Sequence, residues 1–104
     1  MRPIAIATID KPRPAVILTR DIARPHMTRV TVAPITSRIR GLSVEVPVGP
    51  RNGLDHECVI NLDNIVTIAA SAVGRQVGWL FDDQEPALTD ALHAAFDLTD
   101  QGDL

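Results

Sequence analysis

Cysteine, aromatic side chains and long apolar runs are all scarce in this 104-residue sequence. The single cysteine, Cys58, excludes an intrachain disulfide framework and a cysteine-based zinc site, and it gives no indication of an oxidising compartment. We find no signal peptide and no apolar run long enough to span a bilayer. The expectation is therefore a soluble cytoplasmic protein that does not associate with a membrane.

Tyrosine is absent, and the aromatic residues are Trp79, Phe81 and Phe96. A surface that stacks several bases on aromatic rings is therefore not expected. The sequence also lacks a nucleotide-binding glycine loop, a metal-ligand cluster and a nucleophile motif, so it predicts no cofactor and no metal site. The histidines have no motif partner and are interpreted as surface residues: His26, His56 and His93.

Valine, isoleucine and eight prolines favour short strands and turns over long helices. The length suits one domain with a modest core. We predict strands over residues 4–9, 15–19, 30–34, 42–48, 58–62 and 65–68, one helical turn over residues 69–73, and either a last strand or an extended bridge over residues 75–80. Pro34 lacks an N–H group and is expected to end the third strand or to place it at an edge.

The apolar period changes to that of a helix near the C-terminus. One stripe repeats at i, i+3, i+4, i+7 and i+8, which is typical of a helix packed on a sheet: Leu88, Ala91, Leu92, Ala95 and Phe96. The opposite face is expected to meet water through Thr89, Asp90, His93 and Asp97. Pattern alone thus predicts a small, mostly antiparallel barrel or sheet that is covered by one C-terminal helix.

An acidic group precedes this helix and is interpreted as helix-start chemistry rather than as a catalytic carboxylate pair: Asp82, Asp83 and Glu85. Either Asp82 or Asp83 is expected to cap the helix. Pro86 is expected in the first turn, where its missing N–H costs little.

Charge is distributed unevenly between the two halves of the chain. Residues 1–51 hold nine of the ten lysines and arginines but three of the thirteen acids, which gives this half a formal charge of +6. Residues 52–104 carry −9, so the chain as a whole carries −3. This asymmetry indicates either an anion-binding half or basic residues spread over a solvated face.

Hydroxyl and guanidinium groups gather after the third predicted strand, at Thr36, Ser37, Arg38 and Arg40, and Arg13 stands at the entry to the second strand. Arginine holds two phosphate oxygens with its planar fork. A phosphodiester attacked by a neighbouring 2′-hydroxyl develops negative charge that such groups stabilise without a metal. Because the pKa of arginine is very high, charge stabilisation is favoured over proton abstraction. A polar turn after an edge strand is the alternative interpretation.

Four segments in matching order carry a family resemblance: 13–18 (RPAVIL), 32–37 (VAPITS), 53–54 followed by 59–65 (VINLDNI), and 78–80 (GWL) before the amphipathic helix. From about residue 3 to residue 98 the sequence resembles the MazF/PemK (Kid) toxins. The resemblance implies one mainly β domain over residues 1–98, an SH3-like β-barrel (MazF/PemK/CcdB-like) with a C-terminal helix, and leaves 99–104 as an acidic C-terminal tail.

The resemblance also implies a function. Members of this family are metal-independent, sequence-specific endoribonucleases of type II toxin–antitoxin systems, called mRNA interferases. They cleave single-stranded RNA, form homodimers, need no cofactor and are silenced by a cognate, MazE-like antitoxin. The expected reaction is attack by the 2′-hydroxyl, which leaves a 2′,3′-cyclic phosphate.

Catalytic roles fall, by this resemblance, on Arg13 and Thr36, which would stabilise the transition state and move protons around the scissile phosphate. RNA-binding positions fall on Lys11, Ser37, Arg38, Asp63 and Asn64. For the last two, a turn that breaks the strand is the alternative. Relatives usually have a longer, glycine-rich loop before the arginine, and some carry an acidic catalytic partner in it. Here the loop is short, and Asp10 is the nearby acid.

Two other functions remain open from the sequence. A non-catalytic toxin of the CcdB type uses the same barrel to bind a protein target such as gyrase, and a binder of this kind does not require the pair Arg13 and Thr36. A degenerate remnant would bind RNA without cleaving it.

Overall fold

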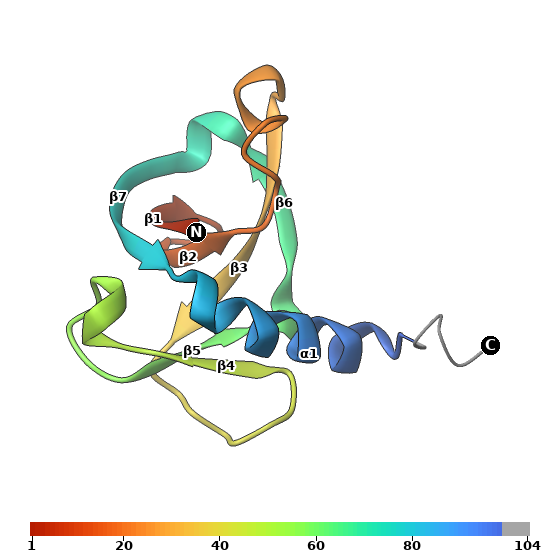
Figure 1. The fold of residues 1–104 in the computed structure, drawn as a ribbon. Coiled ribbons are helices and arrows are strands. Elements are labelled where there is room, and N and C mark those ends of the chain that lie inside the picture. The colour runs from red at the N-terminus through yellow and green to blue at the C-terminus, as the bar shows by residue number, and fades with distance from the viewer. Residues whose placement is uncertain (99–104) are drawn as a thin grey trace.

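The computed structural model describes residues 1–98, which form a curled antiparallel sheet and one C-terminal helix packed against it (Figure 1). The acidic tail expected at residues 99–104 lies outside the described residues. The strands are β1 (Arg2–Thr8), β2 (Pro12–Ile17), β3 (Arg29–Thr36), β4 (Glu45–Val48), β5 (Cys58–Asn61), β6 (Val66–Ala69) and β7 (Val73–Leu80), and the helix is α1 (Glu85–Phe96). The six predicted strands and the helix are therefore confirmed, with shifts of a few residues at their ends, and residues 75–80 belong to a last strand rather than to an extended bridge.

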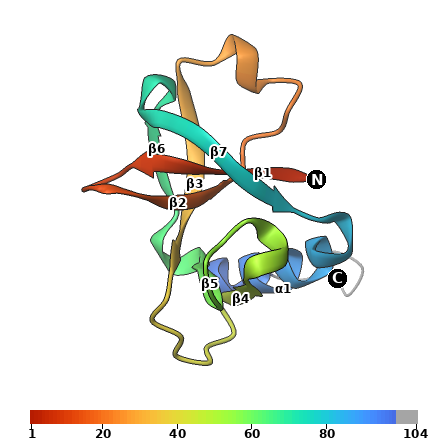
Figure 2. The same ribbon diagram turned by 90° about the vertical axis from the view of Figure 1, so that its left-hand side faces the viewer.

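The sheet curls into a half-barrel because its strands are ordered β4-β5-β3-β2-β1-β7 and β6 also pairs with β3. Every pairing is antiparallel. The turned view shows β7 crossing over the β1–β2 hairpin, with β3 running behind them to the lower loop (Figure 2). β3 is the central strand, since it pairs with β2, β5 and β6.

The third strand does not end at Pro34, which corrects the expectation from sequence. β3 continues to Thr36, and Pro34 is buried inside it opposite Ala15 of β2. Its other neighbour changes at this point, because β3 pairs with β6 as far as Val32 and with β5 from Ile35 onward. A residue without an N–H is tolerated where the ladder on one side is interrupted.

Apolar side chains fill both faces of the central strands. On β2, Val16 belongs to the cluster that α1 covers with Leu88, whereas the alternate residues Ala15 and Ile17 belong to a second cluster with Val30. Because side chains on both faces of β2 are buried, its sequence is a continuous apolar run and does not alternate between apolar and polar residues.

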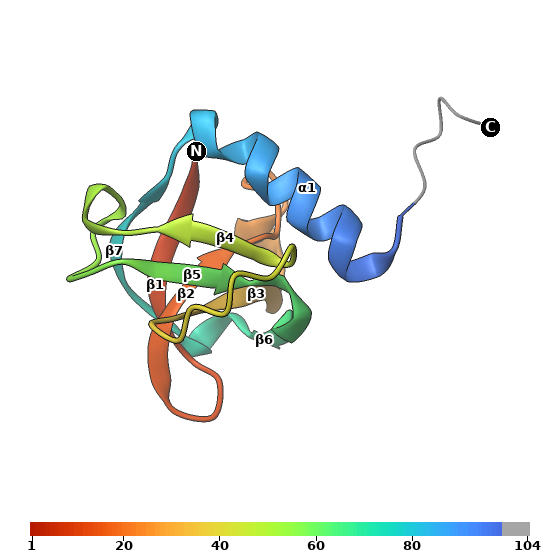
Figure 3. The ribbon, with the colours of Figure 1, turned by 90° about the horizontal axis from the view of Figure 1, so that it is seen from below.

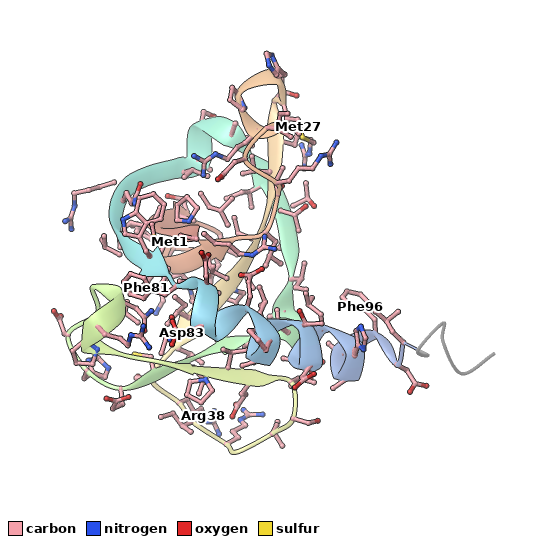
Figure 4. The ribbon with its side chains drawn as sticks, viewed as in Figure 1. Met1, Met27, Arg38, Phe81, Asp83 and Phe96 are labelled. Carbon is pink, nitrogen blue, oxygen red and sulfur yellow. The ribbon has the colours of Figure 1, made fainter. Side chains whose placement is uncertain are left out.

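The C-terminal helix follows its predicted pattern except at its last turn. Leu88 and Ala91 are buried as predicted, and Pro86 lies in the first turn. Phe96 is 58% exposed, so its expected place in the packed stripe is wrong. The reason is geometric: the last turn of α1 runs past the strands, as the labelled position of Phe96 shows (Figure 4). At 12 residues, α1 is too short to cross a membrane, and no other helix within residues 1–98 could do so.

Neither Asp82 nor Asp83 caps this helix, which is a second correction. Both lie in the 3-10 turn before it, and long-range partners bind their carboxylates. The carboxylate of Asp82 accepts a hydrogen bond from the N-terminal ammonium at 2.6 Å. The carboxylate of Asp83 forms a bidentate salt bridge with the guanidinium of Arg51, with both hydrogen bonds at 3.0 Å. The side chain of Gln84 instead accepts the N–H of Phe81 at 2.9 Å.

A buried amide joins the loop before β5 to the end of β7. Asn52 donates to the carbonyl oxygen of Trp79 and to Oε1 of Gln84, each at 2.8 Å. The loop lies so close to β7 that a Cβ on Gly78 would overlap the carbonyl oxygen of Asn52. Glycine is therefore required there for steric reasons.

Candidate active site

Strand register brings Arg13 and Thr36 together. Ala15 of β2 lies opposite Pro34 of β3 in the antiparallel ladder. Arg13 is two residues before Ala15, and Thr36 is two residues after Pro34, so both side chains emerge on the same face at neighbouring positions.

Both side chains line one pocket of about 180 Å³, where β2, β3 and β5 meet the loop after β3. Its lining consists of Arg13, Pro34, Thr36, Arg38, Arg40, Asn61 and Asn64. This set supplies three guanidinium groups, one hydroxyl and two carboxamides, and no carboxylate. Larger hollows of about 240, 270, 310 and 400 Å³ lie elsewhere, but each is lined by a single arginine. All of them except the one of 270 Å³ are also lined by a carboxylate. Chemistry rather than size therefore marks the smaller pocket as an anion site.

The guanidinium of Arg13 is held on one side and unsatisfied on another. Its Nη2 lies 2.9 Å from Oδ1 of Asp10 and donates to Oδ2 at 3.1 Å. Its Nε is buried and finds no hydrogen-bond acceptor among residues 1–98. Leaving a buried donor unpaired is costly, and such groups concentrate where a ligand completes the site. The Nε–H of Arg13 is thus a polar group in the wall of this pocket that the described chain leaves unsatisfied.

The carboxylate of Asp10 is ionised at neutral pH. A hydrogen bond from its own backbone N–H, another from the N–H of Lys11, and the charge of Arg13 together hold the pKa of Asp10 below its usual value. Asp10 is thus an acceptor that orients Arg13 and is not a proton donor at this pH.

The hydroxyl of Thr36 is oriented by the turn that follows it. Its Oγ1 accepts the backbone N–H of Arg38 at 3.1 Å. Because this bond uses a lone pair of the oxygen, the hydroxyl proton is free to be donated to a ligand. The same turn begins the loop that carries Arg38 to the underside of the molecule (Figure 4).

A family model described as PemK-like, MazF-like toxin of type II toxin–antitoxin system matches residues 3–96 of this chain. The chain belongs to this family. The curated relative endoribonuclease MazF3 of Mycobacterium tuberculosis (strain CDC 1551 / Oshkosh) is 56% identical over 98 residues, which cover 94% of this chain and 95% of the relative.

Solved structures of the same family confirm the fold expected from the resemblance. The Mycobacterium tuberculosis toxin MazF-mt6 superposes with a TM-score of 0.93 at 55% identity and covers 94% of this chain and 99% of its own. A mycobacterial endoribonuclease solved in complex with its cognate antitoxin gives a TM-score of 0.80 at 21% identity, with 94% and 93% covered. At that identity the likeness shows the fold alone. The SH3-like barrel with a C-terminal helix is thus established for this MazF-like chain.

The residues assigned from the family resemblance divide into two groups. Arg13, Thr36, Arg38 and Asn64 line the pocket. The other three are exposed and do not line the pocket: Lys11, Ser37 and Asp63. Ser37 and Asp63 are each next to a lining residue in the chain, and Lys11 is two residues before Arg13; we call these three the rim residues.

Two polar lining residues have no role assigned by the family resemblance. Arg40 was noted for its chemistry alone, whereas Asn61 was hidden inside a predicted strand. Asn61 is the last residue of β5, and its Oδ1 accepts the N–H of Asp63 at 2.9 Å, which leaves its amide N–H groups as the donors it can offer. Alternation along β5 could have found it, since Asn61 shares the face of Val59, the residue opposite Thr36. Within residues 1–98, no three His, Cys, Asp or Glu side chains lie close enough to hold a metal ion.

Proposed function

We propose that this chain is the toxin of a type II toxin–antitoxin system and acts as a metal-independent, sequence-specific endoribonuclease on single-stranded RNA. One observation carries the proposal: Arg13 and Thr36 line one pocket together with two further arginines and no carboxylate. The relative that is 56% identical is named an endoribonuclease, which supports the same reaction.

In the proposed reaction the 2′-oxygen of the substrate loses its proton to solvent water and bonds to phosphorus, while the bond from phosphorus to O5′ breaks and O5′ takes a proton from water. The products are a 2′,3′-cyclic phosphate and a 5′-hydroxyl. Arg13 binds the non-bridging oxygens through its guanidinium, and Thr36 donates a hydrogen bond from its hydroxyl to the same phosphate. Both interactions strengthen as negative charge grows on the phosphate, which is the condition for catalysis.

The remaining lining residues serve RNA binding in this proposal. Arg38 and Arg40 supply positive charge for flanking phosphates, and Asn61 and Asn64 offer amide groups to phosphates or base edges. The rim residues found above extend this surface. The arginines thereby supply the positive charge that divalent ions supply in other nucleases.

The partners follow from the same proposal. We place the chain in the cytoplasm as a homodimer whose cognate, MazE-like antitoxin covers the pocket and silences it. The mycobacterial endoribonuclease of the same fold was solved with its cognate antitoxin, which supports this assignment. An antitoxin segment that is acidic would complement the three arginines of the pocket.

Incubation of the purified protein with a long unstructured RNA in the presence of a chelator tests this function. Cut ends mapped by primer extension should fall at one short sequence and carry a 2′,3′-cyclic phosphate, and a 2′-deoxy nucleotide 5′ to the cut should block it. Intact RNA after prolonged incubation would refute the proposal. The CcdB-like alternative is not favoured, because the curated relative at 56% identity is named an endoribonuclease. If the chain acted as a CcdB-like toxin, its expression would arrest growth and block DNA supercoiling while cellular RNA stayed intact.

A further inference from the structure

We propose that Glu45 is a positioning residue that holds the β3–β4 loop, residues 37–44, so that Arg38 and Arg40 face the RNA pocket. The inference deepens the proposed function and rests on it. Glu45 is the first residue of β4, and its backbone pairs with Asn61 of β5, another residue of the pocket. It therefore connects the loop to the rigid part of the sheet.

The carboxylate of Glu45 gathers three consecutive backbone N–H groups. Its Oε1 accepts from Arg40 at 3.1 Å, from Gly41 at 2.8 Å and from Leu42 at 3.2 Å, and its Oε2 accepts from Arg40 at 3.3 Å. Successive N–H groups that converge on one anion form a nest. Gly41 makes the required turn with a φ of +73°, a conformation that favours glycine.

Packing does not determine the shape of this loop. Residues 37–43 are all exposed, and a Cβ built on Gly41 would have no atom within 4 Å. In the described chain, side chains anchor the loop at two places: Thr36 binds the N–H of Arg38 at its start, and Glu45 binds three N–H groups near its end. The loop lies on the underside of the molecule, below β4 and β5 (Figure 3). Backbone hydrogen bonds hold only the end of the loop, from Glu45 N to Leu42 O at 3.1 Å and from Leu62 N to Val44 O at 3.0 Å. The segment that carries both arginines therefore depends on the two side-chain anchors.

Glu45 also positions the arginines without neutralising them. Its oxygens are taken up by backbone donors, and it forms no ion pair with Arg38 or Arg40 within residues 1–98. An acid with free oxygens at this position would pair with one guanidinium and remove it from RNA binding. The nest therefore keeps a carboxylate next to a cationic pocket while the positive charge stays available to phosphate.

Removal of this carboxylate should affect RNA binding more than chemistry. In Glu45→Ala the loop must be ordered by the RNA itself, so we expect Kd and KM to rise roughly tenfold, the scale set by ordering two long side chains. The kcat should stay within about twofold of the wild type, because Arg13 and Thr36 remain anchored by β2 and β3. The slope of log Kd against log salt concentration should fall by about 0.7 for each phosphate that the loop no longer neutralises.

The test measures binding of a fluorescent RNA oligonucleotide, made uncleavable by one 2′-deoxy nucleotide, across a salt series, together with cleavage kinetics of its all-RNA form. Glu45→Gln keeps Oε1 as an acceptor and should restore affinity to near the wild-type value. Glu57→Ala removes an exposed carboxylate outside the pocket and is the matched control. Adding Glu45→Ala to a variant that already lacks Arg38 and Arg40 should change neither Kd nor the salt slope.

Distinct results overturn distinct claims. Unchanged Kd and salt slope in Glu45→Ala would refute the positioning role, and so would a Glu45→Gln variant as weak as Glu45→Ala. A further loss of affinity in the background without the two arginines would also refute it, since Glu45 would then act by another route. If the wild type binds RNA but does not cleave it, the proposed function fails while the binding series still decides the role of Glu45. If Glu45→Ala does not fold, Glu45→Asp, whose shorter side chain reaches fewer of the loop N–H groups, takes its place in both backgrounds with the same expected results.

Discussion

Replacement of Arg13 by alanine is expected to remove most of the cleavage activity while leaving the fold intact. The Nη2 of Arg13 is paired with Asp10, and the guanidinium lines the pocket together with Thr36, where its positive charge would meet the phosphate. The loss of one preorganised donor to a developing oxyanion costs about 10²–10³ in kcat, or about 3–4 kcal/mol. We therefore expect at least this loss for Arg13→Ala.

Folding stability should respond far less than activity. Alanine removes a buried donor that is unsatisfied in the free protein, which favours folding, and it also removes a solvent-exposed ion pair with Asp10, which opposes it. Because exposed pairs contribute little, the free energy of unfolding should stay within about 1 kcal/mol of the wild type. Arg13→Lys keeps the charge but not the planar fork and should recover only part of the rate.

The assay is single-turnover cleavage of a short RNA in chelator, with urea unfolding of the same preparations. A rate for Arg13→Ala within about threefold of the wild type would refute the assignment, since the transition state would then have kept its stabilising donors. An Arg13→Lys variant as fast as the wild type would show that charge alone suffices and that the geometry of the fork is irrelevant. A large loss of stability in Arg13→Ala would instead make Arg13 a structural residue.

Three further predictions address the hydroxyl, the packing and the thiol. Thr36→Val should lower kcat by about 10²-fold with little change in stability, whereas Thr36→Ser should keep most of the rate, as single-turnover cleavage would show. Gly78→Ala forces a Cβ against the carbonyl oxygen of Asn52 and should lower the free energy of unfolding by about 1–3 kcal/mol in urea; an unchanged midpoint would contradict this close approach. Burial, with the nearby charges of Glu57 and Asp55, raises the pKa of the Cys58 thiol, so it should react with a thiol reagent at pH 8 far more slowly when folded than in denaturant. Since the unfolded chain then loses this proton first, stability should fall as pH rises through the ordinary thiol pKa, and less so in Cys58→Ala.

The strands could be predicted from sequence because their apolar residues repeat locally, but their neighbours could not. Pro34 illustrates the difference. The missing N–H is a local fact that predicts a strand end, whereas the change of partner from β6 to β5 that accommodates it is set by residues far along the chain. Arg40 and Asn61 escaped assignment for the same reason, since only the assembled sheet brings the loop and the end of β5 to one pocket.

The helix shows the corresponding limit at the C-terminus. Periodicity correctly identified which side of α1 faces the sheet, and Leu88 and Ala91 are buried there. It carries no information about where the sheet ends, so Phe96 was placed in the core although it lies beyond the strands. The capping prediction was wrong for a similar reason. Asp83 binds Arg51, which comes from a loop far away in the sequence, and not the backbone N–H groups at the start of the helix.

The pairing of Arg13 with Thr36 is protected by the same packing that holds the sheet together. A slip of one residue between β2 and β3 would turn Arg13 to the opposite face of its strand, towards the cluster that contains Val16 and Ile35. Both faces of these strands are filled with apolar side chains, so the slip would bury an unpaired guanidinium and expose apolar groups. The register that best buries the core is therefore also the register that brings the guanidinium and the hydroxyl to one phosphate.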